Sequence, residues 1–162
     1  MARIDAATAG GQNRVAFLDM LAASEIGAPL LAKSDDGYNV LVGATAAQPL
    51  LFSSYAAHPD IYNRKFNSTA AGRYQILSRY WRIYQAQMKL PDFGPVSQDR
   101  YALQQLREHL ALPLIDAGRF VEAVAKVSNV WASLPGAGYG QHENDIGRLQ
   151  AAYQAAGGQV AV

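Results

Sequence analysis

Residues 13–26 read NRVAFLDMLAASEI, and this pattern predicts the first helix. The side chain of Asn13 can cap the N-terminus, and Gly27 followed by Pro29 is typical of a helix end. Apolar side chains recur at helical spacing along the stretch, so one helix face can pack into a core. The predicted helix carries Glu25 to its C-terminal end.

Glu25 shares one helical face with Leu18, Leu21 and Ala22, because these residues lie at offsets of 3, 4 and 7 along the chain. Desolvation on an apolar face disfavours the charged carboxylate, and the negative end of the helix dipole acts in the same direction. Both effects raise the pKa of the carboxyl group, as a general acid requires. The alternative is an exposed glutamate without a role.

The rest of the chain predicts one early hairpin and several further helices. Residues 38–42 and 50–52 are strand-like and flank a turn, and a loop follows over 53–67. Helical patterns then cover 69–90, 97–110, 119–131 and 143–156, with a loop at 134–141. We expect a flexible arm over 1–12 and a single α+β, predominantly helical domain over 13–162, with the hairpin beside a helical core.

Composition excludes several classes of protein. The chain has 162 residues, a formal net charge of +1 and no cysteine, which argues against a disulfide framework and a nucleic-acid surface. His58, His109 and His142 lack metal-ligand spacing, so each is interpreted as a solvated or core histidine. Neither a secretory signal nor a membrane-spanning run is visible in the sequence, and no strand–G-x-S-x-G–helix elbow is present.

Residues 68–75 read STAAGRYQ and form a second candidate site. Ser68 or Thr69 can cap a helix, and Gly72 in its first turn would let a ligand approach the backbone closely. Hydrogen-bond donors and a ring face then come from Arg73, Tyr74 and Gln75. The alternative is a plain capped helix whose glycine only relieves packing.

Residues 128–141 read SNVWASLPGAGYGQ and form a third candidate site. Aromatic rings with amide and hydroxyl donors on a loop are suited to holding sugar rings. A nucleotide loop is excluded because no strand precedes Gly136 and no lysine follows it in the required position. The alternative is a glycine-rich loop beside a core tryptophan, Trp131.

Four blocks together resemble the lambda-type phage lysozyme family over nearly the whole chain. They are AFLDMLAASE (16–25), STAAGRYQILSRYW (68–81), SQDRYALQQL (97–106) and SNVWASLPGAGYGQ (128–141). The resemblance implies a lysozyme-like fold with a substrate cleft between a helical lobe and a hairpin lobe. It also implies a phage endolysin that is a lytic transglycosylase.

The resemblance further implies a site and a reaction. Glu25 is expected to act as acid and base on the β-1,4 bond between N-acetylmuramic acid and N-acetylglucosamine, forming a 1,6-anhydro end without metal or cofactor. The loops at 53–67 and 135–142 are expected to close over the glycan, and Gln75 matches a glutamine that lines the cleft. The candidate substrate-binding residues are Ser24, Tyr55, Gly72, Arg73, Tyr74, Gln75, Ser133, Tyr139 and Gln141.

Two alternative functions remain open. A hydrolytic muramidase would use Asp35 or Asp36 as second carboxylate, although SDDG (34–37) is also typical of a turn. A non-catalytic domain would only bind peptidoglycan. In the favoured interpretation the partners are peptidoglycan glycan strands, and the protein is a monomer without nucleic-acid or stable membrane association. It stays in the host cytoplasm until a holin-dependent lesion releases it to the periplasm.

Overall fold

The computed structural model describes residues 1–138 and 143–162, and the chain divides into two compact units. The helical unit comprises 1–25 and 99–162, and the hairpin unit comprises 26–98. The single domain that the sequence predicts over 13–162 therefore consists of two units, each with buried apolar side chains of its own.

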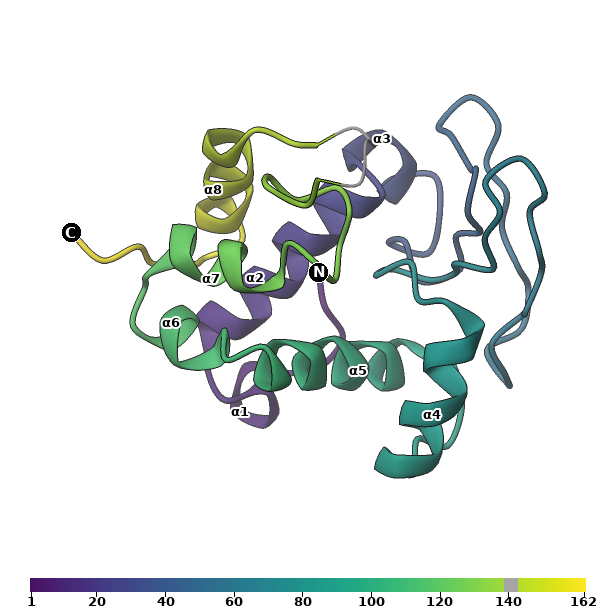
Figure 1. Ribbon diagram of the computed structural model, residues 1–162, viewed down its shortest axis with the longest axis horizontal. Coiled ribbons are helices and arrows are strands. Elements are labelled where there is room, and N and C mark those ends of the chain that lie inside the picture. The colour runs from purple at the N-terminus through teal and green to yellow at the C-terminus, as the bar shows by residue number, and fades with distance from the viewer. Residues whose placement is uncertain (139–142) are drawn as a thin grey trace. The chain divides into compact units, whose positions relative to one another are not determined.

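Helix α2 (Gln12–Glu25) is the central element of the helical unit (Figure 1). It packs against α1 (Ala6–Ala9), α6 (Leu112–Asp116) and α8 (Ile146–Ala155). Helix α7 (Phe120–Val127) packs against α6 and α8. Because helices surround α2, its apolar residues are buried on more than one face, as expected of a core helix.

An aromatic cluster fills the core beside α2. The ring of Phe17 lies 5.9 Å from that of Phe120 and 6.3 Å from that of Tyr153, and the rings of Phe120 and Tyr153 stack at 4.8 Å. Such pairs bury large apolar areas, so the cluster joins three helices that are far apart in the sequence. This core fixes the helix whose last residue is Glu25.

The predicted helix at 13–26 is confirmed, but the predicted cap is wrong. Asn13 lies inside α2, where its Nδ2 donates to the carbonyl of Ile115 at 3.0 Å and its Oδ1 accepts from the amide of Gln159 at 2.9 Å. The side chain therefore joins distant segments instead of capping its own helix. The helix end near Gly27 is confirmed, and this glycine has φ +83°.

The segment 1–12, for which the sequence predicts a flexible arm, contains the short helix α1. Asp5 caps α1 by accepting from the amide of Thr8 at 2.7 Å. The amides of Arg3 and Ile4 both donate to Oδ2 of the buried Asp99 at 2.8 Å. These long-range bonds and the burial of Ile4 hold the segment in place, which local composition could not reveal.

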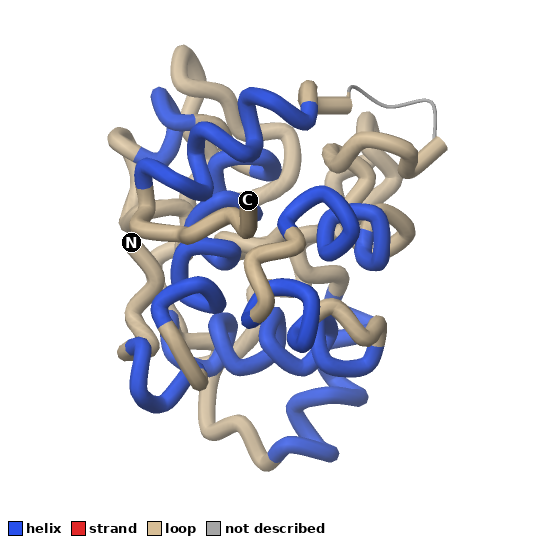
Figure 2. The backbone as a smooth tube through the Cα atoms, turned by 90° about the vertical axis from the view of Figure 1, so that its left-hand side faces the viewer, coloured by secondary structure: helices blue, strands red, loops and turns tan. Residues whose placement is uncertain are grey.

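The hairpin unit contains α3 (Ala28–Leu31), α4 (Ser78–Met88) and short antiparallel bridges. The predicted hairpin is confirmed in its pairing, because Val40 bridges to Leu51. The pairing is too short for named strands, and Figure 2 draws the described residues as helix and loop only. Helix α5 (Pro95–Glu108) begins in this unit and continues into the helical unit.

The helix predicted over 69–90 is wrong in its first third. Helix α4 begins only at Ser78, and Ala71 instead bridges to both Leu41 and Ile76. Long-range pairing therefore overrides the helical pattern of the TAAGRYQ segment. The N-cap residue of α4 is Leu77, so the cap predicted at Ser68 or Thr69 is wrong, although Oγ1 of Thr69 accepts from the amide of Ser78 at 3.1 Å.

Gly72 lies in the turn between these bridges, not in a first helical turn. Its φ is +80°, and an added Cβ would overlap Oε1 of Gln98. Gln98 is fully buried and holds three backbone groups, donating from Nε2 to the carbonyls of Tyr38 and Phe93 and accepting from the amide of Arg73. Gly72 is therefore required for close packing of the turn against α5.

The remaining predicted helices are confirmed with shifted bounds. Helix α5 begins two residues before the predicted start, α7 ends at Val127, and α8 begins at Ile146 after an Asp145 cap. Trp131 lies beyond α7 and is buried, as the core interpretation predicts. Among the described residues, no helix combines the length and apolar character that a membrane crossing needs.

Candidate active site

Glu25 is the last residue of α2, and the residue is half-buried. Protein atoms surround the carboxyl group, and this burial raises the pKa of Glu25 to about 7. A carboxyl with a pKa near neutrality can give up and regain a proton at physiological pH, as the sequence predicts.

Ser133 opposes the effect of burial. Its hydroxyl donates to Oε1 of Glu25 at 2.5 Å, and together with the Ser133 amide it lowers the pKa of Glu25. The serine lies in a turn that follows α7, closed by a bond from the amide of Leu134 to the carbonyl of Trp131. A donor on one carboxyl oxygen stabilises the carboxylate after it has released its proton.

Ser24 and Asn144 extend the hydrogen-bonded set from Ser133. The hydroxyls of Ser24 and Ser133 are 2.7 Å apart, and Nδ2 of Asn144 lies 3.1 Å from Oγ of Ser24. The amide of Asn144 also donates to the carbonyl of Ser133 at 2.8 Å. Four side chains from α2, the turn after α7 and the segment before α8 thus form one connected set.

Glu143 holds the described part of the glycine-rich loop. Its carboxylate accepts from the amides of Gly138 at 2.9 Å and Gly136 at 3.3 Å, and these bonds lower its pKa. A carboxylate that accepts from two adjacent amides fixes the path of the loop backbone. The predicted substrate-binding residues Tyr139 and Gln141, and His142, lie outside the described residues.

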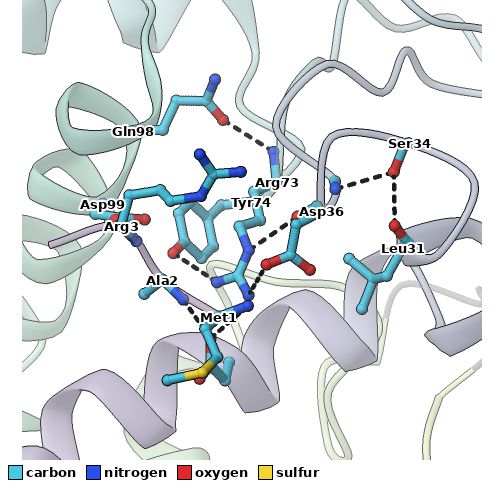
Figure 3. Close-up of polar contacts among 12 residues, drawn as sticks. Met1, Ala2, Arg3, Leu31, Ser34, Asp36, Arg73, Tyr74, Gln98 and Asp99 are labelled. Carbon is cyan, nitrogen blue, oxygen red and sulfur yellow. Dashed lines mark hydrogen bonds and ion pairs between the residues drawn. The ribbon is translucent and has the colours of Figure 1, made fainter.

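Arg73 and Tyr74, two of the predicted substrate-binding residues, are buried. Both residues are 1% exposed. The guanidinium points toward Asp36 and the Tyr74 hydroxyl (Figure 3), donating to the Asp36 carbonyl at 3.0 Å and to the hydroxyl at 3.1 Å. It also lies over the ring of Tyr38, with 5.2 Å to its centroid. The Arg73 guanidinium and the Tyr74 hydroxyl therefore have partners inside the hairpin unit.

Other predicted substrate-binding residues differ in accessibility. Gly72 is buried against Gln98, and Ser24 is 9% exposed. Gln75 and Tyr55 are half-buried. Nε2 of Gln75 donates to the carbonyl of Gly72 at 2.9 Å. The Tyr55 hydroxyl donates to Oδ2 of Asp35 at 2.6 Å.

The two candidate second carboxylates lie in a turn, as the SDDG pattern predicts. The amide of Tyr38 donates to the carbonyl of Asp35, and the amide of Gly37 donates to the hydroxyl of Ser34. Oδ2 of Asp36 lies 3.5 Å from the guanidinium of Arg73. Both acidic side chains thus have structural partners within the hairpin unit.

His58 is held as a core histidine, in agreement with its interpretation. Its ring lies 4.6 Å from that of Phe93, Nδ1 accepts from the amide of Asp60, and Nε2 contacts the carbonyl of Ile76 at 2.7 Å. Within residues 1–138 and 143–162, histidines and acidic side chains form no group of three that could hold a metal ion.

Sequence reasoning missed Gln98, Glu143 and Asn144. Gln98 belongs to the quoted block at 97–106 but carries no spacing signal that would assign it a role. Glu143 and Asn144 follow the glycine-rich loop, and their partners become visible only when the backbone is placed. A side chain that bonds to distant backbone cannot be paired with its partner from the sequence, because every segment offers the same amides and carbonyls.

Comparison with known proteins agrees with this arrangement. A family model described as Endolysin matches residues 15–160. The endolysin of Escherichia phage lambda is 50% identical over 151 residues, covering 91% of this chain and 92% of the relative. That of Escherichia phage P2 is 46% identical over 155 residues, covering 91% and 94%.

Solved structures give the same result. The structure of bacteriophage lambda lysozyme complexed with a chitohexasaccharide superposes with a TM-score of 0.83 at 46% identity, covering 99% of this chain and 100% of that one. A second structure of lysozyme from bacteriophage lambda gives 0.80 at 45% identity, with the same coverage. The predicted lysozyme-like α+β fold is therefore confirmed, and the chain belongs to the endolysin family.

Proposed function

We propose that this protein is a phage endolysin and lytic transglycosylase that cleaves peptidoglycan with Glu25 as its acid and base. The substrate bond is the β-1,4 linkage from N-acetylmuramic acid to N-acetylglucosamine. The observation that carries the proposal is the buried carboxyl of Glu25, with a pKa of about 7 and a hydroxyl donor on Oε1. Membership of the endolysin family and the saccharide complex of its structural relative support it.

The reaction needs one group that can donate and then accept a proton. Neutral Glu25 gives its proton to the glycosidic oxygen as the bond from the anomeric carbon to that oxygen breaks. The Glu25 carboxylate then takes the proton of the muramic C6 hydroxyl, whose oxygen bonds to the anomeric carbon. Glu25 is thereby neutral again, the product carries a 1,6-anhydro end, and no water is consumed.

The surroundings of Glu25 suit both halves of this cycle. Burial favours the neutral acid at the start, and the Ser133 bond stabilises the carboxylate formed midway. A pKa near 7 leaves large fractions of both forms at neutral pH. We retain Tyr55, Gln75 and Ser133 as proposed glycan contacts, because each keeps accessible surface.

Replacement of the carboxyl tests the assignment of Glu25. Glu25→Gln keeps shape and an acceptor for Ser133 but cannot transfer the proton, so clearing of bacterial cell walls should fall by about 10²–10⁴-fold or more. The matched control is Asp35→Asn, which removes a carboxylate while leaving Tyr55 an oxygen acceptor. It should retain most activity. Full activity of Glu25→Gln would exclude the assignment, and an inactive Asp35→Asn would favour the hydrolase with a second carboxylate.

We also propose that the protein acts as a monomer on periplasmic peptidoglycan and waits in the host cytoplasm until a holin opens the inner membrane. Expression of this chain alone should leave cells intact, whereas chloroform or a co-expressed holin should cause rapid clearing. Lysis without either treatment would contradict this route. Size-exclusion chromatography tests the monomer directly.

A further inference from the structure

The hydrogen bonds behind Glu25 form a chain of four side chains, all in the helical unit. Ser133 donates to Oε1 of Glu25, Ser24 lies 2.7 Å from Ser133, and Asn144 lies 3.1 Å from Ser24. Ser24 is 9% exposed and does not contact the carboxyl through a described hydrogen bond. In this chain, the hydroxyl groups of Ser133 and Ser24 lie between the Glu25 carboxyl and the Asn144 side chain.

The orientation of Asn144 follows from its other neighbours. Its Nδ2 lies 3.1 Å from the carbonyl oxygen of Ser24 and 3.4 Å from that of Ser133. Carbonyl oxygens only accept, so the atom that faces them must be the amide nitrogen. At the Ser24 hydroxyl, Asn144 is then a donor and cannot accept. The same side chain also satisfies a carbonyl in the last turn of α2.

A pure donor at one end gives the chain a single direction. When Glu25 is a carboxylate it can only accept, so the single Ser133 proton is directed to Oε1. Ser133 then has no proton left for Ser24 and accepts from it, and the Ser24 oxygen accepts from Asn144. The chain in this direction supports the charged form of Glu25.

We propose that Asn144 and Ser24 are positioning residues, which hold the Ser133 hydroxyl as a donor to the catalytic carboxylate. A donor held in place favours the carboxylate that forms when the proton leaves, and hydrogen bonds in series strengthen one another. This proposal rests on the proposed function, because Glu25 is a catalytic residue only if that function is correct. The hydrogen-bond direction itself does not depend on which reaction occurs.

Charged groups near the chain have other partners. Glu143 accepts from the amides of Gly136 and Gly138, and Asp145 caps α8 by accepting from the amides of Gly147 and Arg148. Burial and the two groups of Ser133 are the causes of the Glu25 shift, and no described charged side chain is among them. A change in Glu25 titration in the variants below therefore does not come from an altered charge, and it reports on Ser133 and the groups that hold it.

The test is a carbon-13 NMR titration of the glutamate carboxyl groups in the full-length protein, with Glu25→Gln to assign the resonance. Ser24→Ala and Asn144→Ala break the chain at two different links. Ser24→Thr keeps a hydroxyl at the same position. Ser128→Ala is the matched control, because it removes a serine hydroxyl of the same unit whose hydrogen bond within the described residues is to the Ala125 carbonyl.

We expect the Glu25 midpoint to rise by about half a pH unit or more in Ser24→Ala and Asn144→Ala, since the carboxylate loses support. Ser24→Thr and Ser128→Ala should titrate like the parent. In the same two variants, the pH at which wall-clearing activity declines on the alkaline side should also rise. Their maximal activity should fall several-fold. A residue with a merely structural role would lower activity without moving either midpoint.

An unchanged Glu25 midpoint in both Ser24→Ala and Asn144→Ala would overturn the proposal. If either variant fails to fold, the other still decides the question, because each breaks the chain separately. Equal shifts in Ser24→Thr and Ser24→Ala would also contradict it. Should Glu25→Gln stay active while the midpoints move as expected, the proposed function fails and the hydrogen-bond direction stands.

Discussion

Glu25 shows how one residue combines opposing effects. Burial at the end of α2 raises its pKa to about 7, and the hydrogen bonds from Ser133 limit that rise. The sequence correctly predicted the apolar surroundings, because Leu18, Leu21 and Ala22 are buried on the same helix. It could not predict Ser133 as the partner, since that serine lies 108 residues further along the chain.

The raised pKa has a consequence for stability. Between the ordinary value of 4.5 and about 7, the folded protein holds a proton that the unfolded chain releases, so stability falls as pH rises through this window. Glu25→Gln removes this loss. Its advantage in free energy of unfolding over the parent should grow from near zero at about pH 4 to about 3 kcal/mol at about pH 8.

Urea denaturation of parent and Glu25→Gln at several pH values measures this difference. The sign is informative, because an acidic group with a lowered pKa would give the opposite slope. An advantage that stays constant with pH would show that Glu25 titrates normally. That result would remove the basis for its role as an acid.

At the scale of elements, the turn around Gly72 explains the largest error of the sequence analysis. Ala, Arg and Gln favour helices, yet residues 69–77 form bridges and a turn before α4. The pairing of Ala71 with Leu41 links segments thirty residues apart, and no local pattern encodes it. The hairpin at Tyr38–Phe52 was predictable, because alternation and the turn between its strands are local signals.

Gln98 stabilises that turn, and we expect its replacement to destabilise the hairpin unit. Gln98→Leu leaves the Arg73 amide and the carbonyls of Tyr38 and Phe93 without their partner. Each buried unsatisfied group costs about 1–3 kcal/mol, so a loss of about 3 kcal/mol or more is expected. Thermal or urea denaturation measures it.

The matched control is Gln104→Leu on the same helix. Gln104 makes an exposed bond to Glu108, so its replacement should change the free energy of unfolding by about 0.5 kcal/mol or less. Equal effects of the two substitutions would show that the buried bonds of Gln98 do not stabilise the turn.

At the scale of the whole molecule, family resemblance and local patterns predicted the fold class, most helices and the place of Glu25. They failed where residues serve contacts between distant segments. Arg73 and Tyr74 have side chains suited to glycan binding, and their burial within the hairpin unit could not be predicted from residue type. Asp99 and Asn13 likewise bond to distant backbone, so their roles depend on the completed fold.

The central claim, that Glu25 serves alone as acid and base of a transglycosylase, is tested most directly by the mass of the reaction products. Purified parent protein should digest peptidoglycan in heavy-oxygen water to fragments that end in 1,6-anhydromuramic acid. These fragments should be one water lighter than hydrolysis products and carry no heavy oxygen at the new end. Reducing ends that contain heavy oxygen would show that water attacks the anomeric carbon, and would contradict the account.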